Sequence, residues 1–444
     1  MTELRRALGP VTTTLIGLGI AIGSGIFRTP GTVAEALSSP ALILGTWLLG
    51  GVFVVASSLV SAELATRFPQ AGGEYVYLRE AYGPFSAFFF GWGYTIFIAG
   101  GGAATIAAAT GEAAAELGGW PQAWAPYLGA AAIVVITMLN LLGLTVGAGL
   151  QNLLTVVKLG VVALVTVAAL WIQPLVTEWP TVALTPGAWV GAILPVLWAY
   201  EGSTDAVKMA EEVKDPERAM PRALLVAATL LTVIYLLVNA AYLSGLGPEL
   251  AGTRFAASVV LGRLWGPVGP RIFAALALLV FLGALSSSIL ATVRVAFALA
   301  RDGLGFSVLS RMSAGQAPIA SFLLTAVIAL AFTLFRGFGQ ILGIYFLAAA
   351  VLFGLSYGSL LVFRARDRGP KPAGQFRAPA GPLLAVGLIV LQLFLGVMIL
   401  KDSPRDGVGT LVLLGICALL YWPLSRRRAR LAASPRPGPG RGIS

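Results

Sequence analysis

Three short stretches place residues that can do chemistry inside otherwise apolar runs of this chain. Gly23, Ser24 and Gly25 interrupt the first long apolar segment, Lys158 lies deep inside another, and Glu201 follows the apolar run of a third. In hydrocarbon every backbone N–H and C=O needs a partner, so a membrane-buried helix breaks only where it is buried in protein or lines a polar cavity. The freed backbone groups of such a break can bind a ligand.

The first interruption suits the two charged ends of an amino acid. A half-helix that starts after Gly25 presents free N–H groups and the positive end of its dipole, which favour a carboxylate. A half-helix that ends before Gly23 presents free carbonyls, which favour an ammonium group. The alternative is helix packing, because Gly19 and Gly23 also form a G-x-x-x-G pair, a spacing that lets membrane helices approach closely.

Lys158 is the only lysine deep inside an apolar span, and it lies too far from either end to reach the interface comfortably. Burial disfavours the charged form of a lysine, whereas nearby carbonyls and hydroxyls favour it, and the run Ser286-Ser287-Ser288 offers hydroxyls. Two interpretations stay open. Lys158 either binds a proton or replaces a cation while it couples conformations, or it carries a fixed charge that clamps helices together.

The second interruption follows Trp198 and Tyr200, where an apolar run meets Glu201 and then Asp205. Glu201 lies at the break and is a candidate to meet a substrate or a proton. If the helix resumes, Asp205 lies one turn further on the same face, where we expect it to pair with a cytoplasmic Lys or Arg. The two aromatic rings either close over a ligand or pack between helices.

The composition indicates an integral membrane protein and excludes several other classes. Of 444 residues, 57% are hydrophobic, and the mean hydropathy is +0.87. Only 11% are charged, which is far below the charged share of soluble domains. The net charge of +11 fits the enrichment of Lys and Arg on the cytoplasmic side of membrane proteins. It fits nucleic-acid binding less well, because the chain has no nucleic-acid-binding motif. Without histidine, neither a Ser-His dyad at Ser24 nor a histidine-ligated metal is possible, so we expect no enzyme and no cofactor. The single Cys417 excludes an intrachain disulfide and disfavours a metal cluster.

The apolar runs predict an all-α membrane protein with twelve transmembrane helices, since about 20 apolar residues span a bilayer. The candidate spans lie near residues 11–35, 40–64, 82–111, 125–146, 150–172, 187–207, 222–246, 270–300, 318–336, 338–363, 379–400 and 407–424.

The basic residues predict the orientation in the membrane. With the N-terminus inside, 22 of the 30 lysines and arginines, Lys208 among them, lie at inner ends and seven lie at outer ends. We therefore expect both termini in the cytoplasm and the protein in the inner (plasma) membrane. Arg28 lies at an outer end and either pairs with Glu35 or faces the outer vestibule. The Pro- and Gly-rich basic tail, residues 425–444, is expected to be disordered.

The two interruptions fall in the first and sixth spans, at corresponding places of two halves. This is the sequence sign of an inverted-repeat transporter whose site lies where the two broken helices face each other. We expect a transport core over residues 1–364 with repeats at about 11–172 and 187–363, and two peripheral helices over 365–424. The repeat is inferred from the placement of the breaks, since the halves share no clear residue identity.

At these residues the chain resembles the amino acid-polyamine-organocation (APC) superfamily, and most closely its L-type amino acid transporter branch with its bacterial relatives. The resemblance covers spans 1 to 11 in order. It is carried by Ile22 to Phe27, Trp198 to Gly202, Ala210 to Ala223, Arg294 to Gly303 and Gln375 to Pro379.

The resemblance implies the leucine-transporter-type fold, a 5+5 inverted repeat with broken helices 1 and 6, and it assigns roles to named residues. The substrate carboxylate is expected at the amides of Ser24, Gly25 and Ile26. The amino group is expected at the carbonyls of Ala21, Ile22, Trp198, Ala199 and Glu201.

The resemblance also assigns roles to side chains. Trp198 matches an aromatic gate. Lys158 matches a lysine that replaces a sodium ion in related carriers and reaches toward Gly19, Ile22 and the serines Ser286 and Ser287. Ser203 departs from the tryptophan that is common in L-type relatives, which leaves the size of the side-chain pocket open.

The predicted function is sodium-independent secondary transport of neutral L-amino acids by alternating access, either by exchange or together with protons. The alternatives are a carrier of cationic amino acids or polyamines, and a different class, a channel or an amino acid sensor that transports nothing. Which amino acid is moved stays open. Animal L-type relatives bond an ancillary glycoprotein through an outer cysteine, and because Cys417 lies inside the twelfth span we expect no such subunit; lipid is the expected surrounding.

Overall fold

The computed structural model describes residues 6, 8–141, 148–180, 184–312, 318–367 and 375–423, so the predicted disordered tail lies outside the described residues. Within these ranges the chain is helical, and the sole β-type pairing there is an isolated bridge between Leu8 and Val213. The first half contains α1 (Pro10–Ala21), α2 (Ser24–Arg28), α3 (Pro30–Leu37), α4 (Pro40–Arg67), α5 (Glu74–Tyr82), α6 (Pro84–Gly93), the π-helix η1 (Tyr94–Gly100), α7 (Gly101–Gly118), η2 (Gln122–Trp124), α8 (Ala125–Leu141) and α9 (Ala148–Leu170). The second half contains α10 (Pro186–Tyr200), η3 (Asp205–Glu212), α11 (Pro216–Leu246), η4 (Gly247–Leu250), α12 (Ala256–Trp265), α13 (Val268–Arg301), η5 (Ser307–Ser310), α14 (Ile319–Phe335), α15 (Phe338–Arg366), α16 (Gly381–Asp402) and α17 (Pro404–Leu419).

Proline starts many of these helices at the boundaries that the sequence marks. Pro10, Pro30, Pro40, Pro186 and Pro216 each occupy the first position of a helix. Proline fits there because its missing N–H has no intrahelical partner in the first turn and its φ angle is already helical. The chain therefore breaks into membrane-length segments at positions that are set locally.

Ten helical segments of the described chain are long and apolar enough to cross a membrane. Of the twelve predicted spans, the sixth (α10, 15 residues) and the ninth (α14, 17 residues) are shorter. The protein is thus a multi-pass, all-helical membrane protein. The count of twelve spans, the inverted repeat and the domain division remain predictions.

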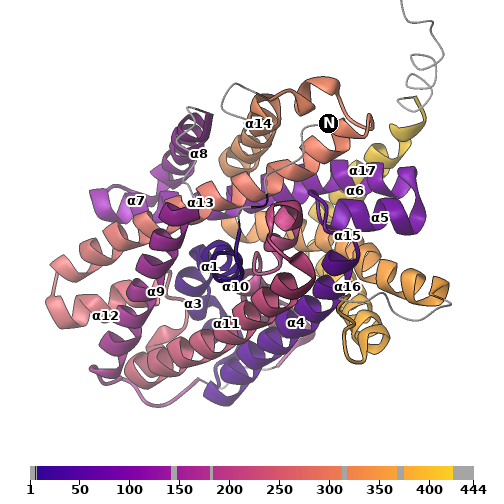
Figure 1. The fold of residues 1–444 in the computed structure, drawn as a ribbon. Coiled ribbons are helices and arrows are strands. Elements are labelled where there is room, and N and C mark those ends of the chain that lie inside the picture. The colour runs from indigo at the N-terminus through magenta and orange to yellow at the C-terminus, as the bar shows by residue number, and fades with distance from the viewer. Residues whose placement is uncertain are drawn as a thin grey trace, which may run out of the picture.

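The arrangement places α1 inside the bundle, with α9, α11 and α13 around it (Figure 1). Burial follows the same order: 72% of the Pro10–Arg28 segment is buried inside the protein, against 33% for α16 and 22% for α17. Large apolar side chains such as Leu393 and Phe394 of α16 are exposed, as expected for a helix that faces lipid. The elements that can form a site are therefore the buried broken helices, while α16 and α17 lie at the periphery.

Both interruptions indicated by the sequence end a helix in the structure. The helix α1 ends at Ala21 and α2 begins at Ser24. The helix α10 ends at Tyr200, and after a turn the chain continues as the 3₁₀ helix η3. The α-helix does not resume after Glu201, so the one-turn relation expected between Glu201 and Asp205 does not apply: the turn and the tighter 3₁₀ geometry set their positions instead.

Candidate functional site

The first break leaves Ile22 and Gly23 outside both half-helices. Ile22 has φ −75° and ψ 87°, and Gly23 has φ −138° and ψ −138°, so neither residue continues the helical ladder. Glycine adopts the latter conformation without a Cβ clash. A Cβ at Gly23 would also lie 3.0 Å from Cβ of Ala284 on α13, so this residue serves packing as well as unwinding.

The two breaks are packed directly against each other. A Cβ added at Gly25 would lie 2.4 Å from Cα of Ala199, which is closer than real Cβ atoms approach. On the other side, Gly202 adopts φ +90°, and a Cβ there would lie 2.5 Å from the Ile20 side chain. Glycines at these two positions thus allow the broken segments to meet at the distance of backbone contact.

Tyr235 of α11 connects the two breaks through one hydroxyl group. Its oxygen lies 3.1 Å from the carbonyl oxygen of Ala21 and 2.9 Å from that of Ala199, so its single proton is shared between these two acceptors. The carbonyl of Ala21 ends α1 and that of Ala199 lies in the last turn of α10, where backbone acceptors lack helical partners. Tyr235 is fully buried, so it fixes the spacing of the two half-helices.

A cavity of about 40 Å³ lies beside the junction of the two breaks. That volume holds about two or three water molecules. We call this space the front cavity. It is lined by Ile20, Ala21, Gly23, Ser24, Gly25, Tyr94, Ile98, Gly102, Ile106, Trp198, Glu201, Gly202, Asp205, Ser288, Thr292 and Tyr345.

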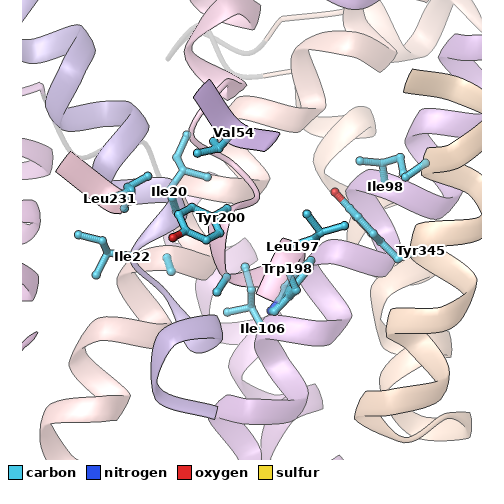
Figure 2. Close-up of a cluster of buried hydrophobic side chains, with 14 of the residues drawn as sticks. Ile20, Ile22, Val54, Ile98, Ile106, Leu197, Trp198, Tyr200, Leu231 and Tyr345 are labelled. Atoms are coloured by element: carbon cyan, nitrogen blue, oxygen red, sulfur yellow. The ribbon is translucent and has the colours of Figure 1, made fainter. Parts of the chain in front are cut away.

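Aromatic side chains bound one side of the front cavity. Figure 2 shows Trp198 beside Leu197 and Ile106, with Tyr345 on a neighbouring helix. The rings of Trp198 and Tyr345 meet edge to face with centroids 5.3 Å apart, a favourable arrangement of aromatic quadrupoles. The indole Nε1 of Trp198 donates to Oγ of Ser24 at 3.4 Å, which links the aromatic wall to the first break.

The predicted binding residues divide into two groups. The cavity lining includes Ala21, Ser24, Gly25, Trp198 and Glu201. Three others, Ile22, Ile26 and Ala199, are fully buried and lie outside that lining. In Figure 2 the Ile22 side chain lies near Leu231, away from Trp198.

Lys158 of α9 reaches the first broken helix. Its Nζ donates to the carbonyl oxygen of Gly19 at 2.6 Å, and the side chain is 2% exposed. Gly283 of α13 lies beside it, since a Cβ there would be 3.4 Å from Cε of Lys158. Lys158 therefore connects α9 to α1 next to α13. Of the predicted serines, Ser286 donates to Oδ1 of Asn140 at 3.1 Å, and Ser287 donates to the carbonyl oxygen of Gly283 at 2.8 Å.

A second buried cation lies after the other break. Lys208 of η3 is fully buried and pairs with Asp205, and its Nζ lies 3.7 Å from Oε1 of Glu74. The ring of Tyr94 lies 5.1 Å from the same nitrogen. The sequence predicts Lys208 at an inner end, and the structure adds that its side chain is buried, because the 3₁₀ turn folds inward. The basic partner expected for Asp205 is this lysine. Two carboxylates, those of Asp205 and Glu74, thus lie beside the one Lys208 ammonium group.

Ion pairs close the two ends of the bundle. At one end, Nε of Arg28 lies 2.7 Å from Oε2 of Glu112 on α7. The proposed pairing of Arg28 with Glu35 is wrong, because the end of α2 faces α7. At the other end, Arg294 of α13 donates to Glu212 at 2.7 Å, and the amide of Leu8 donates to the Glu212 carbonyl at 3.0 Å.

Sequence reasoning missed several residues of the site. Tyr94 and Ile98 reach the cavity from the π-helix η1, Tyr345 from α15 and Thr292 from α13. Ser288, which the sequence indicated as a hydroxyl near Lys158, lines the cavity as well. A π-helix inside a longer helix often marks a functional site. The glycine run 100–102 was a local signal of this irregularity, whereas Tyr235 and Tyr345 lie in regular apolar helices that carry no such sign.

Among the residues that the structure describes, no group of three or more His, Cys, Asp or Glu side chains is placed to hold a metal ion. The groups that the structure brings to the two breaks are backbone amides and carbonyls, aromatic rings and the side chains of Lys158, Glu201, Asp205 and Lys208.

Comparison with known proteins assigns the family. The amino acid permease family matches residues 8–421. The serine/threonine exchanger SteT of Bacillus subtilis is 28% identical over 438 residues, which cover 96% of this chain and 98% of SteT. The b(0,+)-type amino acid transporter 1 of Homo sapiens is 29% identical over 377 residues, covering 82% of this chain and 77% of the relative. An uncharacterized transporter of Mycobacterium tuberculosis is 33% identical over 306 residues, covering 68% of this chain and 67% of the relative.

These relatives are transporters, and the match extends over nearly the whole described chain, including both broken helices and the cavity between them. The chain belongs to the amino acid permease family of the APC superfamily and is a multi-pass membrane protein of amino acid transport.

Proposed function

We propose that this protein is a sodium-independent secondary transporter of neutral L-amino acids that works by alternating access, in exchange for another amino acid or together with a proton. It resides in the plasma membrane with both termini in the cytoplasm. The similarity to a serine/threonine exchanger over nearly the full length of both chains supports exchange and small neutral substrates.

One observation carries the proposal: residues on both sides of the first break line the same cavity as Trp198 and Glu201 of the second. Ala21 contributes a carbonyl from the end of α1, and Ser24 and Gly25 contribute amides from the start of α2. Acceptors and donors at one break match the ammonium and carboxylate groups that all α-amino acids share. We therefore assign the common backbone of the substrate to the first break, with Ile22, Ile26 and Ala199 holding the broken segments in place.

Lys158 supports the sodium-independent part of the proposal. Its ammonium group contacts the carbonyl oxygen of Gly19 just before the first break and lies beside α13. A lysine can hold such a carbonyl in the way that a bound cation would, without any ion from solution. Trp198 is the proposed gate, because its ring covers the cavity and bonds to Ser24.

A second candidate, transport of cationic amino acids, rests on the charges at the other break. Asp205 and Glu74 pair with the single ammonium of Lys208, and Glu201 lines the front cavity beside Asp205, so the three carboxylates would exceed the one positive charge if all were ionised. A cationic substrate side chain or a proton would balance this excess. Glu201 and Asp205 both line the front cavity. Asp205 pairs with Lys208, whereas Glu201 forms no ion pair among the residues that the structure describes.

The test is uptake by purified protein in liposomes without sodium. Vesicles are loaded with one unlabelled amino acid, and entry of each of the twenty labelled amino acids and of putrescine is measured, with and without an inward proton gradient. We expect entry of small neutral amino acids to depend on an amino acid inside. Entry of lysine or arginine alone would establish the second candidate, and uptake equal to that of empty liposomes for every compound would refute both.

A further inference from the structure

A second polar pocket, which we call the rear pocket, lies on the other side of the second break. Its volume is about 20 Å³, enough for about one or two water molecules. The turn after α10 separates the two spaces, since Glu201 and Gly202 line both the front cavity and the rear pocket. The remaining walls come from α4, α5, α15 and α16, with Ser57, Glu74 and Gln392 among the polar groups.

Two buried polar atoms in this pocket have no protein partner among the described residues. They are Oε2 of Glu74 and Oε1 of Gln392. The two residues are 6% and 3% exposed. Buried oxygens of this kind are satisfied by ordered water when protein groups do not reach them. The pocket that both residues line has the size for that water.

The acidic side chains around the rear pocket can take up and release a proton beside the fixed positive charge of Lys208. Lys208 pairs with Asp205 and lies 3.7 Å from Glu74. Glu201 lines the front cavity together with Asp205 and the rear pocket together with Glu74. When Glu74 takes up a proton, Lys208 keeps Asp205 as its counter-charge. The other titratable groups that face Glu201 or Glu74 are the hydroxyls of Tyr77, Tyr94, Tyr345 and Tyr357.

Glu74 also lies near the surface from which a proton can arrive. It begins α5, four residues after the exposed Gln70. The loop before α5 is tied to η3, because the amide of Ala71 donates to Glu211 at 2.9 Å and that of Gly72 to the Lys208 carbonyl at 3.2 Å. Glu74 is therefore the residue of the rear pocket that joins it, through residues 70–73, to an exposed part of the chain.

We propose that the rear pocket holds ordered water that connects Glu201 to Glu74 and gives Glu201 a proton route separate from the front cavity. The carboxylic acid of Glu201 gives its proton to the water, which passes a proton to the Glu74 carboxylate. Glu201 is left ionised and Glu74 neutral until Glu74 releases the proton to solvent. Glu201 can then change its charge while a substrate occupies the front cavity. The transport readout of this inference rests on the proposed function, whereas its structural and spectroscopic readouts do not.

The first experiment is direct: an electron cryo-microscopy structure at a resolution that resolves water. We expect density for water within hydrogen-bond distance of both Glu74 Oε2 and Gln392 Oε1. A dry pocket, or a pocket closed by rearranged side chains, overturns the proposal whether or not the protein transports amino acids.

The second experiment compares Glu74→Gln with Glu80→Gln, a matched variant on the same helix whose side chain is exposed and contacts Arg79. Proton entry is followed with a pH-sensitive dye inside liposomes, relative to labelled amino acid entry in the same vesicles. In Glu74→Gln we expect the ratio of protons to amino acid to fall at least tenfold, because glutamine keeps the shape but accepts no proton. Glu80→Gln should keep the wild-type ratio. An equal ratio in all three proteins, or amino acid exchange that moves no protons in the wild type, overturns the route and leaves the proposed function intact.

The third experiment decides the route if no amino acid is transported at all. The infrared band of protonated Glu201, identified by its loss in Glu201→Gln, is followed after transfer of purified protein into deuterated buffer. Exchange of its proton should slow at least tenfold in Glu74→Gln and stay unchanged in Glu80→Gln. Equal exchange rates in the three proteins refute the inference.

Discussion

The two helix breaks meet at one cavity but present different chemistry. The first break, at Ile22 and Gly23, offers backbone groups with no charged side chain in the break itself. The second leads from Glu201 into η3, where Asp205 and Lys208 are buried together. Backbone groups suit what all amino acids have in common, whereas side-chain charges distinguish substrates and respond to protons. Under the proposed function, we therefore expect the first break to bind the groups that all substrates share, and the second break to select among substrates and to couple transport to protons.

The largest effect is expected from the contact that holds the breaks together. Gly25→Val should abolish transport, because even its Cβ would lie 2.4 Å from Cα of Ala199 and would push α2 away from α10. Exchange in liposomes measures the effect, with thermal stability in detergent as a second readout. Gly160→Val is the matched control, since nothing lies within 4 Å of a Cβ at Gly160. Normal exchange by Gly25→Val would show that the two breaks need not touch.

Lys158→Ala tests whether the first break, which has no charged side chain of its own, depends on a charge supplied by the neighbouring helix α9. Loss of the bond to Gly19 leaves a buried carbonyl unpaired, a change of about 1–3 kcal/mol, so exchange should fall at least about fivefold. Thr155→Val removes another α9-to-α1 bond, 3.1 Å to the Leu15 carbonyl, without a change of charge, and should have a smaller effect.

A second measurement on Lys158→Ala tests whether this lysine couples amino acid uptake to a proton gradient. Uptake into vesicles that contain no amino acid is measured with and without an inward proton gradient. If gradient-driven accumulation persists undiminished in Lys158→Ala, this lysine has no part in coupling, and Glu201 becomes the candidate.

Glu201→Gln tests whether the second break selects among substrates by their charge. Because a hydrogen bond to a charged group contributes about 1.5–3 kcal/mol, inhibition of serine uptake by lysine should weaken by about tenfold or more relative to inhibition by alanine. Glu201→Asp keeps the charge and should restore part of the preference. Competition curves for the three proteins measure the effect, and an unchanged ratio would remove Glu201 from substrate selection.

Tyr235→Phe tests the hydroxyl that joins the two breaks. Loss of one buried hydrogen bond contributes about 1 kcal/mol, so exchange should fall by about threefold to tenfold. Tyr200 is the matched control: its ring lies 4.9 Å from that of Tyr235, but its hydroxyl donates to Trp47, away from the breaks. Tyr200→Phe should lower thermal stability similarly and change exchange less than about twofold. Equal loss of exchange in both variants would contradict a specific role for Tyr235.

The smallest effect is expected far from both breaks. Arg67 donates to Asp367 at 3.0 and 2.6 Å and holds the pKa of that carboxyl below its usual value. This stabilisation is present above about pH 4 and is lost as the pH falls through the lowered pKa, since the protonated carboxyl pairs weakly. Asp367→Asn should destabilise the protein by at most about 1 kcal/mol, because the pair is partly exposed. Melting curves at neutral and acidic pH measure this difference, which should vanish in acid while exchange stays unchanged.

The sequence by itself determined the class of the protein and the places where its helices end. Apolar runs interrupted at Gly23 and Glu201 predict helix breaks, and α1 and α10 end beside these residues. Such features depend on neighbours in the chain: glycine and proline set local backbone geometry, and hydrophobic length sets the membrane spans. Together with the quoted motifs, they were sufficient to indicate the family.

Only the tertiary structure decided which groups meet at the breaks. Tyr235 bonds residues that are 214 and 36 positions away, and nothing in the regular helix α11 marks it. Arg28 has Glu35 nearby in sequence but pairs with Glu112, because the direction of α2 and not sequence distance selects the partner. Lys208 reads as a loop residue, yet η3 turns it inward between Asp205 and Glu74. Contacts between distant segments depend on how whole helices pack, and local pattern contains no record of that packing.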